Sequence, residues 1–319
     1  MSLQIENLSV YYQTLKGDVH ALEDITLDVK LGEIMGLAGE SGCGKTTLCQ
    51  SLIYLNPPMK YMTGRVMLNG NELPIWDAEK MNQHRFRDIS IIPQYAMNAL
   101  NPIRKIGPMI RDLLTSKKVD YKDRLPELKH RLDVVNLPHD VLGMYPFELS
   151  GGMKQRMVMV LSTLLDPTLL IADEITSALD VASQKAVSEL LVKFLDEGCC
   201  KSAIFITHDI SILYQIANTI TVMYAGYLAE KASTETIIHS PRHPYTKLLI
   251  ASLPKIGVKY SEKHLKGIPG HPPLLLNPPI GCRFRDRCPL AFEKCTEVPP
   301  FVEIEKDHFI ACWREGSHA

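Results

Sequence analysis

The residues best suited to chemistry form a glycine-rich run near the start of the chain. It reads Gly39-Glu40-Ser41-Gly42-Cys43-Gly44-Lys45-Thr46-Thr47 and fits the spacing G-x-x-x-x-G-K-[ST] of a phosphate-binding loop. Glycines let the backbone approach a phosphate and turn several N–H groups toward it. Lys45 would contact the outer phosphates, and Thr46 would offer its hydroxyl to Mg²⁺. The run therefore predicts a site for a phosphate-bearing ligand and Mg²⁺.

The flanking residues predict the elements that such a loop needs. Residues 34–38 are apolar and read as a buried strand. Residues 45–55 place three leucines on one helix face, and Pro57-Pro58 ends that helix. The partial positive charge of a helix N-terminus would help the loop to bind an anion. The alternative interpretation is a glycine-rich surface turn that happens to precede a helix.

Two carboxylates follow another apolar run. Residues 169–172 read as a buried strand, and Asp173 and Glu174 come directly after it. A carboxylate at a strand end beside a phosphate loop can help to hold Mg²⁺, and a second one can polarise an attacking water. An exposed acidic turn is the alternative, and the phosphate loop makes it the weaker interpretation.

A third candidate is the run Leu149-Ser150-Gly151-Gly152-Met153-Lys154-Gln155-Arg156. A helix that starts here offers N–H groups and a hydroxyl to an anion, although an ordinary serine helix cap fits the local chemistry equally well. The full run resembles the signature of the ATP-binding subunits of ABC transporters. In that family the signature contacts the γ-phosphate held by the other subunit. The resemblance implies ATP hydrolysis, ATP and Mg²⁺ as ligands, and a head-to-tail pair of ATPase subunits.

Four further positions match this family in order along the chain. The resemblance implies that Tyr12 stacks on adenine, with a core tyrosine as the alternative. It implies that Gln94 senses Mg²⁺ and contacts the transmembrane subunit. The run Ser177-Ala178-Leu179-Asp180 matches the loop that crosses the dimer interface, and His208 matches the histidine that contacts the γ-phosphate.

Carried over residue by residue, the resemblance implies catalytic roles for Glu174, His208 and Gln94. It assigns Mg²⁺ to Thr46, Gln94 and Asp173. The residues that it assigns to the nucleotide are Tyr12, Gly39, Ser41, Gly42, Cys43, Gly44, Lys45, Thr46, Thr47, Gln94, Ser150, Gly151, Gly152, Asp173 and Asp180.

This sequence departs from the family at two places. Ile175 stands where the family usually has a proline after the catalytic glutamate, which bears on local rigidity. Tyr95-Ala96 stand where the family usually has an acid and a proline. The second departure lies on the surface that faces the membrane partner, so it bears on partner specificity.

The alternation of short apolar runs with helical patterns predicts an α/β fold with a largely parallel sheet. Residues 3–12 read as an edge strand paired with residues 21–29. Together with the resemblance, this gives a P-loop ABC ATPase fold with a mixed sheet and a RecA-like core. We expect an ATPase domain over residues 1–235, a helical subdomain at about 96–155, and a loop-rich unit over residues 236–319.

Composition limits the partners. The net charge of −1 gives no electrostatic reason to expect nucleic acid. We find neither a signal peptide nor an apolar run of the ~18 residues needed to span a bilayer. We therefore expect a cytosolic protein. The family resemblance implies peripheral binding to the cytoplasmic face of the membrane, through two permease subunits and indirectly with an extracytoplasmic substrate-binding protein.

The second half of the chain indicates a subfamily of these ATPases. Residues 243–249, 268–273, 281–284 and 287–289 resemble the C-terminal extension of oligopeptide, dipeptide and nickel importer ATPases. This implies import of peptides, with nickel and oligosaccharides open, and a dimer partner that is a different ATPase chain. A soluble ABC-type ATPase acting on nucleic acid or ribosomes ranks lower, because the chain has one phosphate loop and little net charge. A metal-sensing module with a degenerate ATPase ranks lower, because the catalytic set is complete.

Four cysteines cluster in this extension: Cys282, Cys288, Cys295 and Cys312. Four thiolates in a proline-rich, helix-poor segment suit a metal centre that replaces a hydrophobic core, although their spacing does not choose the metal. Four reduced, buried thiols are the alternative. The resemblance implies a [4Fe–4S] cluster, with His308 as a possible substitute ligand. We expect this cluster to be structural and far from ATP.

Overall fold

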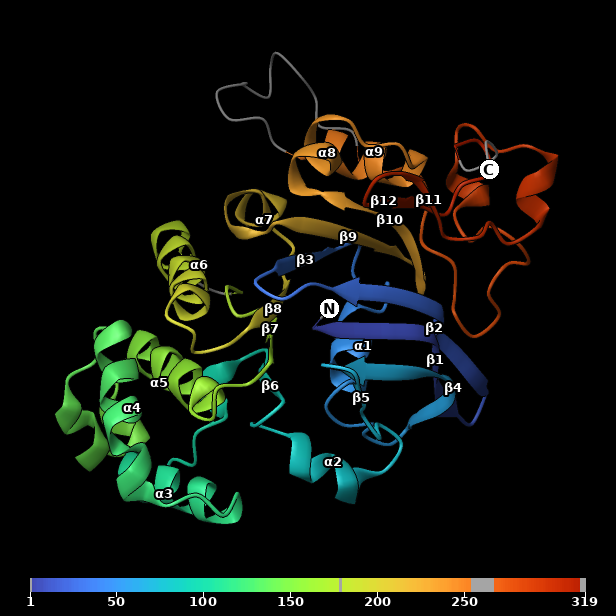
Figure 1. Ribbon diagram of the computed structural model, residues 1–319. Coiled ribbons are helices and arrows are strands. Elements are labelled where there is room, and N and C mark those ends of the chain that lie inside the picture. The colour runs from blue at the N-terminus through green and yellow to red at the C-terminus, as the bar shows by residue number, and fades with distance from the viewer. Residues whose placement is uncertain (1, 178–179, 254–266, 316–319) are drawn as a thin grey trace.

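The computed structural model describes residues 2–177, 180–253 and 267–315 (Figure 1). Its strands are β1 (Leu3–Thr14), β2 (Gly17–Val29), β3 (Ile34–Ala38), β4 (Met59–Leu68), β5 (Asn71–Glu72), β6 (Ile89–Ile92), β7 (Leu169–Asp173), β8 (Ser202–Ile206), β9 (Thr219–Tyr224), β10 (Tyr227–Ser233), β11 (Val302–Glu305) and β12 (His308–Ile310).

The α-helices are α1 (Lys45–Ser51), α2 (Ala78–His84), α3 (Ile106–Ser116), α4 (Tyr121–Val134), α5 (Gly151–Thr163), α6 (Val181–Asp196), α7 (Ile210–Ile216), α8 (Thr234–His239) and α9 (Pro244–Ala251). Short 3₁₀ turns are η1 (Ala96–Asn98), η2 (His139–Gly143), η3 (Pro146–Glu148), η4 (Arg285–Arg287) and η5 (Glu293–Thr296). No helix within the described ranges is long and apolar enough to cross a membrane.

The smaller of two sheets is antiparallel and has the order β2-β1-β4-β5. Strand β1 pairs on both sides, with Ile5 opposite Leu27 of β2 and Val66 of β4. The prediction of an edge strand at residues 3–12 is therefore wrong. Alternating apolar residues report that one face of a strand is buried, but they do not report how many neighbours the strand has.

The larger sheet has the order β11-β12-β10-β9-β3-β8-β7-β6. Its centre is parallel, from β9 through β3, β8 and β7 to β6. Every residue of β3, β7 and β8 is buried, which is the pattern expected for parallel strands covered on both faces. This confirms the expected α/β fold with a mixed sheet. The carboxyl ends of β3, β6, β7 and β8 meet at one edge, where such sheets bind ligands.

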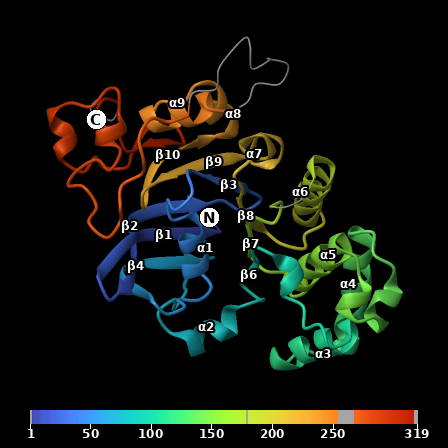
Figure 2. The same ribbon diagram turned by 180° about the vertical axis from the view of Figure 1, so that it is seen from behind.

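Helices α3, α4 and α5 form a group beside the end of this sheet at β6. In Figures 1 and 2 these green segments lie on the opposite side of the molecule from the red C-terminal residues. Buried leucines, isoleucines and valines hold the group together, among them Ile110, Leu128 and Leu132.

The C-terminal residues add strands to the larger sheet. Strand β12 pairs antiparallel with β10, with Ile310 opposite Glu230 and Phe309 opposite Lys231, and β11 pairs with β12. The boundary expected at residue 235 thus falls just after β10, beside a sheet that continues into the extension. The chain's last strands are neighbours of its ATPase core.

Candidate functional site

The phosphate loop, residues 39–47, has the geometry that its glycines require. It connects β3 to α1, and Gly39 and Gly44 have φ values of 145° and 109°. A Cβ atom on Gly39 would lie 2.3 Å from the carbonyl oxygen of Met223, and one on Gly44 would lie 2.7 Å from that of Ala21. Because side chains rarely tolerate positive φ and have no space here, only glycine fits at these two positions. The helix α1 ends at Ser51, earlier than the leucine pattern predicted.

Lys45 and Thr46 are held by the loop and by β7. The Lys45 ammonium donates to the carbonyl oxygens of Gly39 at 2.8 Å and Glu40 at 3.1 Å, so it lies across the loop. The Thr46 hydroxyl donates to Oδ1 of Asp173 at 3.3 Å. Burial, and then the nearby Glu174 carboxylate, raise the pKa of Asp173 to about 6. Two of the three residues assigned to Mg²⁺, Thr46 and Asp173, therefore lie side by side where α1 begins and β7 ends.

The three residues assigned to catalysis meet at Glu174. His208 Nε2 lies 2.6 Å from Oε1 of Glu174, and Gln94 donates from Nε2 to Oε2 at 2.9 Å. The three side chains come from the ends of β7, β8 and β6. Glu174 has a φ of 49° and is 9% exposed, so its carboxylate is fixed at an uncommon backbone geometry. The arrangement can orient a water and accept a proton from it.

Two further residues assigned to the nucleotide, Tyr12 of β1 and Cys43 of the phosphate loop, have local partners. The Tyr12 hydroxyl lies 3.1 Å from the Thr47 hydroxyl, so Tyr12 is beside the phosphate loop. The Cys43 N–H donates to the carbonyl oxygen of Glu40 at 3.2 Å, and its thiol is buried. Burial raises the pKa of the Cys43 thiol, which keeps it neutral and inert. Ser41 and Gly42 are exposed at the tip of the loop.

The structure does not bring the signature run to the phosphate loop of the same chain. In Figures 1 and 2, β6 and β7 lie between α5 and α1. Ser150 is the N-cap of α5 and accepts from the Met153 N–H at 3.3 Å, and Gly151 and Gly152 are exposed. The local serine cap is therefore present, and the glycines face outward.

The run that matches the interface loop is described in part, because Ala178 and Leu179 lie outside the described residues. Asp180 caps α6: it accepts from the Ser183 N–H at 3.0 Å and from the Ser183 hydroxyl at 2.8 Å. These hydrogen bonds lower the pKa of Asp180, with the one from the Ser183 N–H contributing most. The carboxylate is thus ionised at neutral pH and fixed by its own helix.

The residues at which the sequence departs from the family differ in their burial and contacts. Ile175 is buried in the apolar core, and its carbonyl oxygen accepts from the Gln155 side chain. Tyr95 has a φ of 58° and is 61% exposed, whereas Ala96 is buried at the start of η1. Tyr95 therefore presents an aromatic ring on the surface directly after Gln94.

The extension contributes contacts that the sequence did not suggest. Arg287 forms a two-pronged ion pair with Glu40 of the phosphate loop, and the Glu40 N–H donates to the Tyr245 hydroxyl at 2.8 Å. Arg287 directly precedes Cys288, so a residue next to the cysteine set contacts the phosphate loop, although the cluster itself is expected to lie far from ATP. Sequence patterns gave no signal for this contact, because Arg287 and Glu40 are 247 residues apart.

The four cysteines of the extension line one small cavity of about 20 Å³. Burial raises the pKa of Cys282 to about 11 and also raises those of Cys288 and Cys312. Within the described residues, no group of three or more His, Cys, Asp or Glu side chains stands close enough to hold a metal ion. The expected substitute ligand, His308, instead lies 2.8 Å from the buried carboxylate of Glu230. The fold gathers the thiols, but it does not place them as a metal-ligand set.

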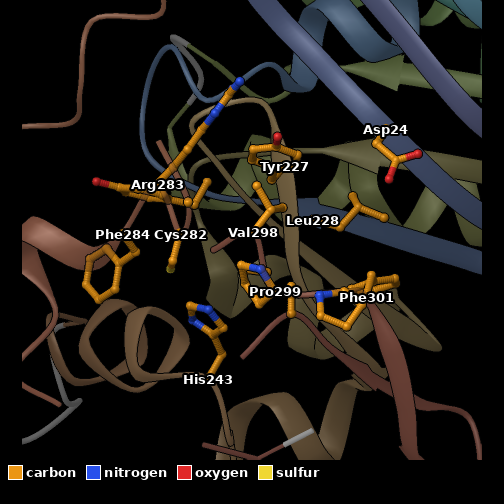
Figure 3. A pocket seen from close by; sticks show the side chains of 15 residues that line it. Asp24, Tyr227, Leu228, His243, Cys282, Arg283, Phe284, Val298, Pro299 and Phe301 are labelled. Carbon is orange, nitrogen blue, oxygen red and sulfur yellow. The ribbon is translucent and has the colours of Figure 1, made fainter. Parts of the chain in front are cut away.

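A larger cavity of about 270 Å³ lies between the extension and the sheets (Figure 3). Arg283 crosses one wall and donates to the carbonyl oxygens of His20 and Ala225 and to Glu23. Its guanidinium lies 4.2 Å from the ring centre of Tyr227. Since these polar groups already have partners, the cavity offers apolar volume rather than a set of free binding groups.

Comparisons with known proteins agree with this geometry. Residues 22–177 match the family described as "ABC transporter", and residues 229–295 match "Oligopeptide/dipeptide transporter, C-terminal region". The chain is similar to a dimeric ATP-binding cassette solved in a post-hydrolysis state with ADP and Pi. That similarity has a TM-score of 0.62 and 24% identity, over 73% of this chain and 98% of that one. It is also similar to cbiO1 from Clostridium perfringens, described as part of the ABC transporter complex cbiONQ, with a TM-score of 0.63 and 22% identity over 75% of this chain and 90% of that one.

Sequence relatives cover nearly the whole chain. The dipeptide transport ATP-binding protein DppD of Bacillus subtilis is 38% identical, over 99% of this chain and 96% of its own length. The protein of the same name from Caldanaerobacter subterraneus is 37% identical, over 98% of both chains. The oligopeptide transport ATP-binding protein OppD of Bacillus subtilis is 35% identical, over 98% of this chain and 88% of its own length.

The site is an ATP-binding cassette: a phosphate loop lies beside paired carboxylates at the edge of a mixed sheet, and the matches agree with this. The chain belongs to the ABC transporter family. Within that family, the second matched region places it with the ATP-binding subunits of the oligopeptide and dipeptide type.

Proposed function

We propose that this chain is the ATP-binding and ATP-hydrolysing subunit of an ABC importer that takes up dipeptides or oligopeptides. The observation that carries the proposal is the meeting of Gln94 and His208 on Glu174, beside the phosphate loop. The relatives named for dipeptide and oligopeptide transport supply the solute class. We assign residues 1–235 to the ATPase domain, with its helical subdomain at about 96–155, and residues 236–319 to the extension.

In this proposal the phosphate loop binds the phosphates of ATP, and Lys45 and His208 hold the γ-phosphate. Hydroxyl and carboxylate oxygens are ligands that Mg²⁺ prefers, so the adjacent Thr46 and Asp173 fit that ion, with Gln94 nearby. Mg²⁺, when bound, supplies positive charge that offsets the phosphate oxygens. We assign the adenine contact to Tyr12, whose hydroxyl lies 3.1 Å from that of Thr47 in the phosphate loop.

The hydrolytic step uses Glu174 as the base. A water oxygen bonds to the γ-phosphorus, the bond from that phosphorus to the ADP oxygen breaks, and Glu174 takes a proton from the water. The hydrogen bond from Gln94 and the close contact with His208 orient the carboxylate for this step. Catalysis then rests mainly on positioning and electrostatics, as in other phosphoryl transfers.

The signature residues act on a second subunit. Ser150, Gly151 and Gly152 are exposed and apart from their own phosphate loop, which supports a head-to-tail dimer that completes two ATP sites. Asp180 would lie at that interface. The partner ATPase is a different chain of the same family, and closure of the pair drives two permease subunits at the cytoplasmic face of the membrane. A substrate-binding protein on the other side delivers the solute.

Reconstitution tests this function. The chain, a second ATPase subunit of the same type and two permeases are placed in liposomes, and ATP hydrolysis and peptide uptake are measured together. We expect hydrolysis to rise when the permeases are present and uptake to require ATP. Full-rate hydrolysis by the dilute, isolated chain would overturn the two-subunit site. Uptake of nickel or an oligosaccharide, but not of peptides, would overturn the solute class alone.

We also propose that the four extension cysteines take a [4Fe–4S] cluster. Four thiols on one cavity are the donor set that such a cluster needs, and they must lose their protons and move closer to bind it. Protein prepared without oxygen should be brown and contain iron and sulfide at about four per chain. Cys288→Ser should bleach it, and Cys199→Ser, a buried cysteine elsewhere, should not. Colourless protein with one zinc, or with no metal, would overturn the cluster.

A further inference from the structure

The phosphate loop contains an acidic residue that the proposed chemistry does not use. Glu40 is the second residue of the loop, and its carbonyl oxygen accepts from the ammonium of Lys45 at 3.1 Å. A carboxylate in a loop that binds a polyphosphate is unfavourable, because like charges repel most strongly where water is scarce. Some other group must offset its charge if the loop is to bind ATP tightly.

Arg287 supplies the opposite charge from the extension. Its Nη1 lies 2.7 Å from Oε2 of Glu40 and its Nη2 lies 3.0 Å from Oε1, so the pair is bidentate. This geometry is the strongest that an arginine and a carboxylate form. Arg287 is 6% exposed at its side chain and Glu40 is 26% exposed, so solvent screens the pair only in part.

The guanidinium is itself fixed by the extension and by β9. Its Nε donates to the carbonyl oxygen of Pro269 at 2.7 Å, and Nη2 donates to that of Ile268 at 3.3 Å. Its Nη1 also donates to the Tyr224 hydroxyl at 3.1 Å. With each guanidinium nitrogen engaged, Arg287 holds the carboxylate in one place.

The backbone of Glu40 is held from the same side. Its N–H donates to the hydroxyl of Tyr245, a fully buried residue of α9. The extension therefore binds Glu40 through its carboxylate and its main chain, directly beside the Gly39 carbonyl that Lys45 contacts.

We propose that Arg287 is a positioning residue for nucleotide binding. It neutralises Glu40 and fixes the start of the phosphate loop, so that the extension forms part of the ATP site. A purely mechanical alternative exists, in which the ion pair only fastens the extension to the ATPase core. The two explanations differ in what happens when both charges are removed.

The experiment compares Arg287→Met, Glu40→Gln and the double variant in the full chain. ATP affinity is measured by titration at low and high salt, and thermal unfolding checks that each variant is folded. We expect Arg287→Met to weaken ATP binding about tenfold at low salt and less at high salt, since it leaves an uncompensated carboxylate. We expect the double variant to recover most of that loss.

Arg285→Met is the matched control. Arg285 belongs to the same 3₁₀ turn, but among the described residues its side chain donates hydrogen bonds to Asp286 and to the Ile280 carbonyl, both within the extension. This variant should bind ATP like the unchanged chain. Arg287→Lys, which keeps the charge but loses the bidentate geometry, should lie between Arg287→Met and the unchanged chain.

Three outcomes would overturn the proposal: folded Arg287→Met with unchanged ATP affinity, a double variant as weak as Arg287→Met, or a salt-independent loss. If Arg287→Met does not fold, Glu40→Gln alone still decides the matter. It leaves the arginine charge beside the phosphates, so ATP should bind at least as tightly as to the unchanged chain, and weaker binding would contradict the charge argument.

Discussion

The phosphate-loop region and the signature region differ in where their polar groups find partners. In the first, Gln94 bonds to Glu174 across 80 residues of sequence, and Thr46 bonds to Asp173 across 127. In the second, the side chains of Ser150 and Asp180 accept hydrogen bonds from groups three residues further along the chain, within the helices that they cap. The fold assembles the first region internally. The second region consists of two capped helix starts, and the proposed function assigns their partner to another chain.

The largest expected effect comes from a substitution in the phosphate-loop region. Glu174→Gln keeps the shape of the side chain but cannot accept a proton, so ATP turnover should fall by at least about a hundredfold while ATP still binds. Phosphate release and nucleotide titration measure the two effects separately, and the variant should also accumulate as an ATP-bound dimer. Glu235→Gln, on the exposed side of α8, is the control. Turnover at the unchanged rate would show that Glu174 is not the base.

A smaller effect concerns the buried charge of Asp173. Its pKa is about 6 in the folded protein and 3.8 as the ordinary value, so between these pH values the folded state binds more protons than the unfolded state. The contribution of Asp173 to the free energy of unfolding without Mg²⁺ should therefore be largest below pH 4 and fall, by up to about 3 kcal/mol, as the pH rises through 6.

Urea unfolding in EDTA at several pH values tests this prediction. Asp173→Asn removes the titration, so the stability difference between the two proteins should change with pH only across this window. A difference that stays flat, or that changes in the opposite sense, would contradict the raised pKa.

The smallest expected effect comes from a substitution in the signature region. A Cβ atom on Gly152 would meet nothing within 4 Å, so Gly152→Leu should leave the isolated chain folded and able to bind ATP. In the presence of the second subunit, turnover should fall about tenfold, equivalent to about 1.4 kcal/mol, because the added side chain blocks close approach. Gly143→Leu, at another open glycine of the helical group, is the control. An equal loss of ATP binding by the isolated Gly152→Leu chain would show that the residue acts within its own subunit.

The phosphate-loop region could be predicted from the sequence because the patterns that indicate it are local. A strand, a glycine loop and a helix occupy consecutive residues, and the carboxyl ends of parallel strands share one edge of a sheet. The sequence places Gln94, Asp173, Glu174 and His208 at such strand ends. The structure brings them within hydrogen-bond distance or one residue of each other.

The remainder depends on contacts that sequence patterns do not encode. Strands β11 and β12 have four and three residues, too few for a periodic signal to distinguish them from loops in a proline-rich segment. The pairing of Arg287 with Glu40 depends on tertiary placement of two charged residues, each of which reads alone as a surface residue. The pattern of residues 3–12 predicted a strand but not that it pairs on both sides. Alternating apolar residues indicate which face of a strand is buried, and they do not indicate whether the strand lies at the edge of its sheet.

The pairing of β12 with β10 has a consequence for biosynthesis. Proteins are made from the N-terminus, and domains fold as they emerge. The outer edge of β10 therefore stays unpaired until residues 308–310, near the end of the chain, have been synthesised. An open strand edge is a template for pairing with other chains. Nascent and truncated chains of this protein should be more prone to aggregation than the finished one, and the last strands act as its built-in protection.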